Sequence, residues 1–334
     1  MSNGNSIPYH LRHNKAVDRN LFIDLLGKVN NCKNISDYVY AGFGGPFLED
    51  FKVMHSVLKI KKMISLEIVE NTHKRQKFNM PNSCIDIGKE PQTSQNFLTN
   101  YNFKKRTRHV VWLDYTLPSM LNDQLGEIEL LCNKLNAYDI LKVTVNAHAE
   151  TLGRDPNAPY SATPQDYRAS NLSSILDRYA PYPIIPDHTN SKRYPTTLLH
   201  AIRKAVNMGL STRSDIFMQP LSSFIYADGQ TMLTATGILL ENDESKINRF
   251  FKRSRLEHWP FIDKTWDKPR NISIPTMSLK ERFEIESKLP NSTPEEIIES
   301  MGFYLSETEP KTINQLKTFI EYQRAIPWFS KVQF

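Results

Sequence analysis

The sequence predicts an α/β protein whose doubly wound, mostly parallel seven-stranded sheet ends in an antiparallel hairpin. Three observations predict this fold class. Short apolar runs alternate with amphipathic helical segments from residue 35 to about residue 208, as in strands joined by crossover helices. A cluster of glycines follows the first apolar run. Finally, two long β-like runs are joined by Asp228-Gly229, a strong two-residue hairpin signal.

The first strand is expected over residues 35–41, a short run rich in β-branched and aromatic residues. Three glycines follow it, Gly42, Gly44 and Gly45, and Pro46 stands where a helix is expected to begin. Glycine lets the backbone turn sharply and approach a ligand, while proline suits the first position of a helix.

A helix is predicted over residues 46–58, and a second strand over 63–66 ends at Glu67. Glu67 stands 25 residues after Gly42, which is close to the spacing of a carboxylate that accepts hydrogen bonds from ribose hydroxyls. The pattern therefore indicates a nucleotide-type ligand. The alternative is a tight turn without a ligand, followed by an acid that only solvates a strand end.

The later elements follow the same alternation. A helix-like run after Glu67 is closed by Pro81. The further strands are expected over residues 83–87, 109–113, 140–145, 216–226 and 231–240. The further helices are expected over residues 93–101, 120–135, 166–179, 196–208 and 311–324, with a capped helix start at residues 292–296.

Four side chains at the ends of predicted strands are candidates for chemistry. Ligands of open parallel sheets lie beyond the carboxyl ends of the strands. Asp86 can accept a hydrogen bond from the amine of a base, and Asp114 with Tyr115 faces the same crevice as the glycines. His148 is a candidate base. The alternatives are an Asp that caps a turn and a His that is structural.

The N-terminal part, residues 1–34, is predicted to be a basic helical arm. Cations cluster at the start of its helix, where the helix dipole disfavours them, so an anionic partner is expected. An arm across the crevice would meet a carboxylate or a phosphate; a solvated tail is the alternative. A second basic run precedes the strand at 109–113. The candidates for nucleic-acid contact are Arg12, Lys15, Arg19, Lys104, Lys105 and Arg106.

Composition sets the remaining expectations. A net charge of +6 and a pI near 9.0 suit an anionic partner such as nucleic acid. The three cysteines lack the spacing of a disulfide framework or a metal site, so no metal is expected. No membrane span or signal peptide is recognisable, which predicts a cytoplasmic protein. Residues 151–195, rich in proline and tyrosine, are expected to form a lid or a partner-binding insertion.

The order of elements and three motifs resemble class I S-adenosylmethionine-dependent methyltransferases, whose sheet also ends in an antiparallel strand. YAGFGGP resembles their glycine loop, SLE their ribose-binding acid and WLDYT the motif that lines the acceptor site. The resemblance covers residues 35–242, followed by a helical extension over 243–334. It implies S-adenosylmethionine as cofactor. The cofactor-binding residues that it implies are Tyr40, Gly42, Gly44, Gly45, Glu67 and Asp86.

By the same resemblance Asp114 and Tyr115 would border the methyl acceptor. Tyr40 and Ala41 stand where an acid usually begins the glycine loop, and the Asn/Asp-Pro-Pro-Tyr tetrapeptide of amine methylation is absent. The first hypothesis is methyl transfer to a nucleic acid, RNA or DNA. The alternative is a catalytically altered subunit that senses a nucleotide or S-adenosylmethionine and acts through protein partners held by residues 151–195 or 243–334. A dehydrogenase is the third possibility.

Overall fold

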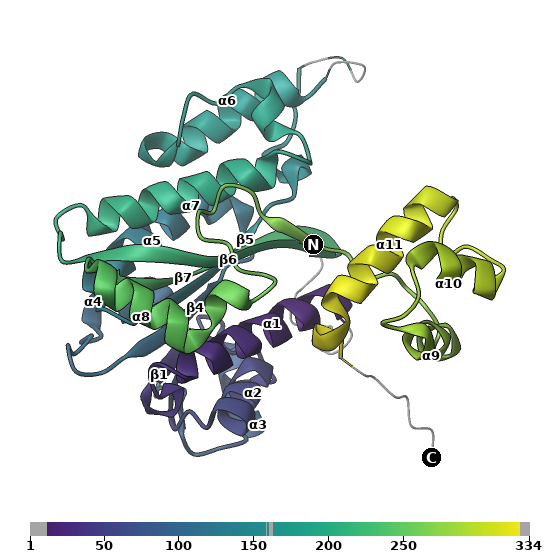
Figure 1. The fold of residues 1–334 in the computed structure, drawn as a ribbon. Coiled ribbons are helices and arrows are strands. Elements are labelled where there is room, and N and C mark those ends of the chain that lie inside the picture. The colour runs from purple at the N-terminus through teal and green to yellow at the C-terminus, as the bar shows by residue number, and fades with distance from the viewer. Residues whose placement is uncertain (1–11, 158, 160–162, 328–334) are drawn as a thin grey trace.

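A single mixed sheet forms the centre of the molecule, with helices on both of its faces (Figure 1). The computed structural model describes residues 12–157, 159 and 163–327. Within them the sheet has eight strands in the order β3-β2-β1-β4-β5-β7-β6-β8. Two predicted parts, residues 1–11 of the arm and 328–334 of the extension, lie outside the described residues.

The five strands on one side of the sheet are parallel, as predicted. Both faces of β5 are covered, and its residues are all buried, including the polar Lys142, Thr144 and Asn146. The parallel strands are β1 (Val39–Phe43), β2 (Lys62–Leu66), β3 (Ile85–Asp86), β4 (His109–Asp114) and β5 (Ile140–Asn146).

The predicted hairpin is confirmed. It joins β6 (Ile216–Asp228) to β7 (Gln230–Glu241) through Gly229, whose φ of +110° is easily adopted only by glycine. β7 runs antiparallel to β5. An eighth strand, β8 (Arg270–Ile272), pairs with β6 and was not predicted, because three residues are too few to show an alternating pattern.

One face of the sheet packs against α1, α2 and α8, and α3 lies beside α2 (Figure 1). The helices of the predicted C-terminal extension share this apolar core and project from the molecule as a lobe (Figure 1). The helices are α1 (His13–Asn30), α2 (Glu49–Leu58), α3 (Glu70–Asn79), α8 (Glu244–Ser254), α9 (Leu279–Lys288), α10 (Pro294–Met301) and α11 (Glu309–Tyr322).

The other face packs against α4, α5 and α7 around a second apolar core. α6, the helix of the predicted insertion, lies beyond α7 on the outer side of this layer (Figure 1). The bounds of these helices are α4 (Ser94–Asn100), α5 (Leu121–Lys134), α6 (Gln165–Leu176) and α7 (Tyr194–Leu210). None of the helices in the described residues is both long and apolar enough to cross a membrane.

The first predicted strand begins later than expected. The chain forms a 3-10 turn at Ile35–Asp37 before β1. Side chains hold this turn: Asn34 Nδ2 donates to Asp37 Oδ2 at 2.9 Å, and Ile35 N donates to Asn30 Oδ1 at 2.9 Å. Such local hydrogen bonds compete with strand pairing, so Gly42 belongs to β1 itself.

The following helix also begins later, at Glu49 instead of Pro46. Residues 44–48 form a turn in which Leu48 N donates to Gly44 O at 3.0 Å. Gly45 and Leu48 both have left-handed backbone, with φ of +52° and +54°. Side chains of α3 hold the turn, since Gln76 Nε2 donates to Gly45 O at 2.9 Å.

Candidate functional site

The carboxyl ends of the parallel strands bring the predicted acids to one edge of the sheet. Gly42 of β1 lies opposite Ser65 of β2 and Trp112 of β4 in the parallel register. Glu67 therefore follows β2 at the edge where Asp114 ends β4. Asp86 ends β3, the outer neighbour of β2, at the same edge. We call this edge the carboxyl edge.

Glu67 is half-buried just beyond β2. Burial raises the pKa of its carboxyl, an effect opposed by hydrogen bonds from the backbone of Val69 and Ile68. Its Oε1 accepts from Val69 N at 2.8 Å. One carboxylate oxygen is thus held by the backbone, which fixes the side chain at the edge. A carboxylate fixed in this way can accept hydrogen bonds from vicinal hydroxyls.

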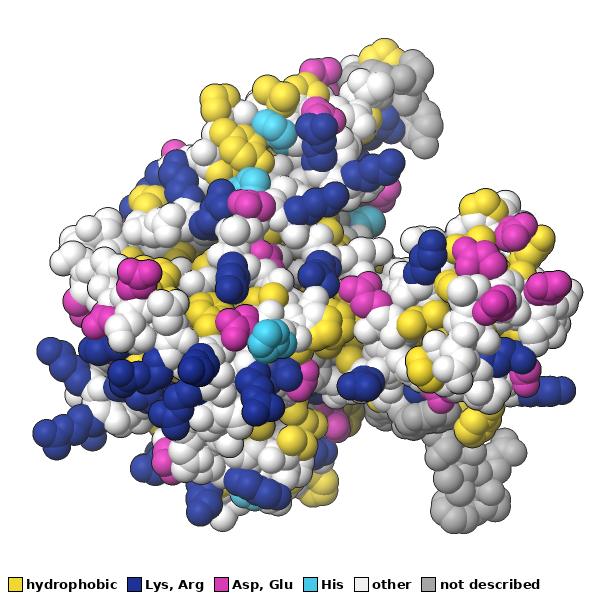
Figure 2. Space-filling view, in the orientation of Figure 1, with side chains coloured by type: hydrophobic (Ala, Val, Ile, Leu, Met, Phe, Trp, Pro, Cys, Tyr) yellow, Lys and Arg dark blue, Asp and Glu magenta, His cyan; other side chains and the backbone are white. Residues whose placement is uncertain are grey.

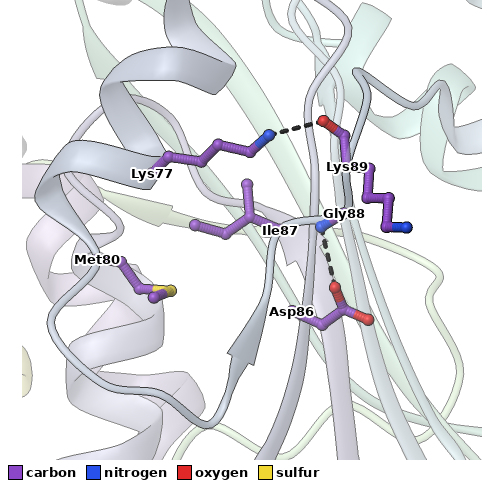
Figure 3. A pocket seen from close by; sticks show the side chains of 6 residues that line it. All are labelled: Lys77, Met80, Asp86, Ile87, Gly88 and Lys89. Atoms are coloured by element: carbon purple, nitrogen blue, oxygen red, sulfur yellow. Dashed lines mark hydrogen bonds between the residues drawn. The ribbon is translucent and has the colours of Figure 1, made fainter.

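An open hollow of about 350 Å³ lies beside Asp86 (Figure 3). Met80 and Ile87 give it an apolar wall, and Asp86 stands at its rim with Oδ1 accepting from Gly88 N at 2.9 Å. Lys77 Nζ of α3 donates to Lys89 O at 2.6 Å and holds the two sides of the hollow together. Apolar walls with one carboxylate acceptor can hold a flat heterocycle that carries an amine.

The glycine loop is tightly packed by the protein itself. A Cβ on Gly42 would stand 2.9 Å from Tyr40 Oη and 3.0 Å from Trp112 O. A Cβ on Gly44 would stand 2.6 Å from Ser65 Oγ and would also overlap the Leu48 side chain. Packing alone therefore requires glycine at these two positions, in agreement with the ligand-free alternative.

The ring of Tyr40 lies in the apolar core, and its hydroxyl lies beside Gly42. Its ring is buried and packs edge-on against Phe51 of α2, with ring centroids 4.9 Å apart. The side chain that replaces the expected acid is thus part of the apolar core. Its expected contact with a cofactor stays a prediction.

Asp114 pairs with a lysine from the N-terminal arm. Its Oδ2 lies 2.7 Å from Lys15 Nζ, and both side chains are buried. Lys15 N also donates to Asp228 Oδ2 at 2.8 Å, which ties the start of α1 to the end of β6. Asp114 Oδ1 is buried and has no hydrogen-bond partner among the described residues.

Two more buried ion pairs continue along the same side of α1. Arg19 pairs with Asp50 of α2. Asp18 accepts from Lys142 Nζ of β5 at 2.8 Å and from Thr234 Oγ1 of β7 at 3.0 Å. Sequence reasoning missed Asp18 and Lys142. The available signals were a lysine inside an otherwise apolar strand and an aspartate near the apolar stripe of a helix.

These contacts correct the expected roles of Lys15 and Arg19. The anions that draw them to the start of α1 are carboxylates of the same chain, and burial keeps both cations from reaching a nucleic-acid phosphate. The alternative of a solvated basic tail does not match the buried α1 either. Arg12 precedes α1 and is half-buried.

Three of the predicted nucleic-acid contacts lie at the opposite edge. Lys104, Lys105 and Arg106 are exposed in the loop that leads into β4, and therefore at the amino ends of the parallel strands. The structure does not bring them together with the acids of the carboxyl edge.

Asp114 and Tyr115 point to opposite faces of the sheet, as successive strand residues do. Tyr115 lies in the second core, where its hydroxyl donates to Glu127 Oε2 of α5 at 2.5 Å. Burial is the main cause that raises its pKa well above the ordinary value. Its hydroxyl is thus held by α5, which does not match the expected position beside an acceptor.

His148 follows β5 at the carboxyl edge and is half-buried. Its Nε2 lies 3.3 Å from Glu150 Oε2, and its backbone N donates to Asn146 Oδ1 at 2.9 Å. A solvent-accessible imidazole beside a carboxylate can accept a proton.

The sequence matches a family model described as "Putative O-methyltransferase" over residues 7–334. The chain belongs to this methyltransferase family. The match confirms the predicted class, the class I methyltransferases, whose methyl donor is S-adenosylmethionine, and the observed strand order agrees with it. The dehydrogenase alternative is therefore set aside.

Several solved methyltransferase structures are similar to the chain at low identity. Trm1 from Pyrococcus horikoshii with S-adenosyl-L-methionine has 12% identity and a TM-score of 0.44, covering 71% of this chain and 57% of its own. An O-methyltransferase from Bacillus cereus in complex with SAH has 10% identity and a TM-score of 0.37, covering 69% and 88%. TomG from Streptomyces achromogenes, in complex with SAM, has 10% identity and a TM-score of 0.35, covering 66% and 79%. A comparison with curated proteins finds no match.

The carboxyl edge of this methyltransferase fits the adenosine half of its cofactor. Glu67 offers carboxylate oxygens where ribose hydroxyls are expected, and the hollow beside Asp86 has the apolar walls that suit a purine. The buried and unpartnered Asp114 Oδ1 offers a further acceptor near the crevice.

Proposed function

We propose that the chain transfers a methyl group from S-adenosylmethionine to a hydroxyl oxygen of a nucleic acid. The observation that carries this proposal is the convergence of Glu67, Asp86 and Asp114 at one sheet edge, in a member of an O-methyltransferase family. S-adenosylmethionine, when bound, would supply the methyl group from its sulfonium to the acceptor oxygen, and S-adenosylhomocysteine would leave. The net charge of +6 supports a polyanionic acceptor.

The cofactor residues have separate roles in this proposal. Glu67 accepts hydrogen bonds from the ribose hydroxyls, and the hollow at Asp86 takes the base. The backbone of Gly44 and Gly45 borders the remaining part of the cofactor, because neither residue has a side chain of its own.

On the acceptor side, His148 takes the proton of the attacking hydroxyl. Its partly exposed imidazole supports this role, and Glu150 at 3.3 Å is placed to orient the ring and to stabilise its protonated form. Asp114 stays paired with Lys15, so its carboxylate is held in one position beside the crevice. In this proposal Asp114 positions the site and does not act as its base.

The division of the chain into an arm (1–34), a methyltransferase-type domain (35–242) and an extension (243–334) is part of the proposal. The lobe of α9, α10 and α11 projects from the body and is proposed as a protein-partner surface, as are residues 151–195 (Figure 1). Exposed Phe303 and Tyr304 on the lobe support this role.

A second candidate is a subunit that binds S-adenosylmethionine without transferring its methyl group. The specific observations that favour it are the buried Tyr40 in place of an acid and the tight packing around Gly44. In this case the cofactor would act as a signal, passed on through protein partners.

The test is transfer of radiolabelled methyl from S-adenosylmethionine to total RNA, DNA or protein extract. The proposal predicts label that ribonuclease or deoxyribonuclease releases. His148→Ala is expected to lower the rate about 10² to 10⁴-fold, the usual contribution of a general base. His258→Ala is the matched control, because His258 also lies beside a glutamate, at 3.4 Å, but is exposed in the 3-10 turn Leu256–His258 that follows α8. Label only in protein would contradict the nucleic-acid acceptor, and cofactor binding without any transfer would favour the sensor.

A further inference from the structure

The amino edge of the sheet carries a concentration of positive charge from three separate segments. Lys and Arg side chains gather over α8 and the adjoining edge of the molecule (Figure 2). We call this surface the basic edge and define it by six residues. They are Lys33, Lys104, Lys105, Arg106, Arg249 and Arg253; five are exposed and Lys33 is half-buried.

Contacts around Tyr138 hold the three segments together. Lys33 Nζ lies 4.0 Å from the centre of the Tyr138 ring, and that ring lies 6.5 Å from the ring of Phe250 in α8. Cys32 Sγ donates to Phe250 O at 3.3 Å, which fixes the end of α1 to α8. Val39 N donates to Arg108 O at 2.8 Å, and the neighbouring Tyr38 Oη donates to Tyr138 O at 3.1 Å, so the loop before β4 lies close to Tyr138.

The backbone of the basic loop is held in shape. Arg108 Nη1 donates to Lys105 O at 2.7 Å, and Asn136 Nδ2 donates to Phe103 O at 3.4 Å. Phe103 is buried against His109, with ring centroids 4.9 Å apart. The loop of residues 104–108 therefore carries Lys104, Lys105 and Arg106 on a backbone that is held by hydrogen bonds and by the buried Phe103.

Carboxylates of the described residues do not neutralise this surface. None of the six cations forms an ion pair with a described carboxylate, whereas neighbouring Lys246 pairs with Glu241 at 3.0 Å. Two acids beside these segments are held by neutral donors: Asp37 accepts from Asn34, and Asp243 caps α8 by accepting from Lys246 N at 3.1 Å. The field of the six cations is thus open to solvent.

The form of the surface favours a phosphate backbone over a lipid bilayer. α8 buries its apolar side chains, Phe250 and Phe251, against the body of the protein. None of the large exposed apolar side chains of the described residues belongs to α8 or to the loop 104–108. An interfacial membrane helix needs such side chains to enter the bilayer, while phosphate contacts need only placed cations.

We propose that the basic edge binds the phosphate backbone of the nucleic-acid acceptor. This inference rests on the proposed function for the identity of the occupant, but the binding itself needs no methyl transfer. β5, with seven residues, spans about 23 Å between the two edges at about 3.3 Å per residue. The acceptor must therefore be long enough to contact the amino edge while its reacting group lies at the carboxyl edge.

The experiment is fluorescence anisotropy of the full chain with a labelled single-stranded 30-nucleotide RNA over a series of salt concentrations. Each phosphate contact contributes about 0.7 to the slope of log K against log salt. Lys104→Ala/Lys105→Ala/Arg106→Ala is expected to reduce the slope by about 2 and the affinity at low salt at least 10-fold. Arg249→Ala/Arg253→Ala is expected to reduce the slope by about 1.4.

Lys311→Ala is the matched control, since Lys311 is exposed on α11 and pairs with Glu307. It is expected to leave the slope unchanged, and circular dichroism checks that every variant is folded. Triple and double variants that bind RNA like the wild type would overturn the inference. Binding to vesicles of anionic phospholipid that needs these residues, without RNA binding, would also overturn it.

The two proposals fail in different ways. If the wild type methylates RNA while the basic-edge variants bind and react normally, the surface assignment is wrong and the proposed function stands. If the wild type binds RNA through the basic edge but transfers no methyl group, the surface assignment stands and the proposed function is wrong.

Discussion

In the proposed function, Glu67 is the residue on which cofactor recognition depends most. Its position beyond β2 costs part of its hydration, which is why its pKa is raised. The backbone of Val69 and Ile68 recovers only part of that cost. A partly buried carboxylate that lacks some of its hydrogen bonds is suited to a ligand whose hydroxyl groups supply them.

Glu67→Gln is therefore expected to stabilise the ligand-free protein slightly at pH 7, by less than about 1 kcal/mol. A carboxyl pKa raised by folding favours the folded state below the unfolded value of 4.5, and this advantage is lost as the pH rises through the folded pKa. Glutamine removes the cost of the charged form, so the difference from the wild type should vanish below pH 4.5. Urea unfolding at the two pH values measures it. A clear loss of stability at pH 7 would contradict this account of Glu67.

At the scale of elements, α1 is held on the sheet by buried charge. Lys15, Asp18 and Arg19 lie at helical spacing on one side of α1, and each meets an opposite charge from another element. The sequence revealed the cations and their need for an anion. It did not reveal the partners, because these come from β4, β5 and α2, far away in the chain.

Lys142→Met is expected to destabilise the fold by about 3 to 5 kcal/mol, because it leaves the Asp18 carboxylate buried with only Thr234 as partner. Lys142→Met/Asp18→Asn should recover more than half of that loss. Lys28→Met is the control on the same helix, since its pair with Asp24 is partly exposed at 3.9 Å and should cost less than about 0.5 kcal/mol. Urea unfolding compares them. Equal effects of Lys142→Met and Lys28→Met would show that the buried pair does not anchor α1.

The turn between β1 and α2 is expected to depend on glycine at position 44. Gly44→Ala is expected to cost about 1 to 3 kcal/mol, because its Cβ would overlap Leu48 and Ser65. Gly27→Ala, at an exposed position near the end of α1, has open space around it and should gain up to about 1 kcal/mol from helix propensity. Thermal unfolding measures both changes. A neutral Gly44→Ala would mean that the turn adapts easily and that packing does not require the glycine.

At the scale of the whole molecule, the arrangement of elements could be predicted because it follows from local patterns. Apolar runs and amphipathic helices gave the parallel strands, and Asp228-Gly229 gave the antiparallel hairpin. The start of β1 was misplaced because polar side chains at Asn30 and Asn34 hold a turn there. β8 was missed because so short a strand is defined by its neighbour β6.

The site could be predicted only in part, because only features that follow from local patterns can be read from the sequence. The acids at the strand ends follow from topology, which places every parallel carboxyl end at one edge. The directions of Tyr40 and Tyr115 depend on the strand register, and the burial of Lys15 and Arg19 depends on the path of α1 across the sheet. Neither the strand register nor the path of α1 can be deduced from the residues nearby in the sequence. The predicted basic residues therefore fall into two groups. Lys15 and Arg19 are buried in α1, and Lys104, Lys105 and Arg106 are exposed at the amino edge.

Calorimetric titration with S-adenosylmethionine and S-adenosylhomocysteine, with NAD as control, tests the central claim that the carboxyl edge holds the cofactor. The account predicts heat of binding from the first two ligands and none from NAD, and a Glu67→Ala variant that stays folded but no longer binds. Absence of binding to the wild type, or unchanged affinity in folded Glu67→Ala, would contradict it.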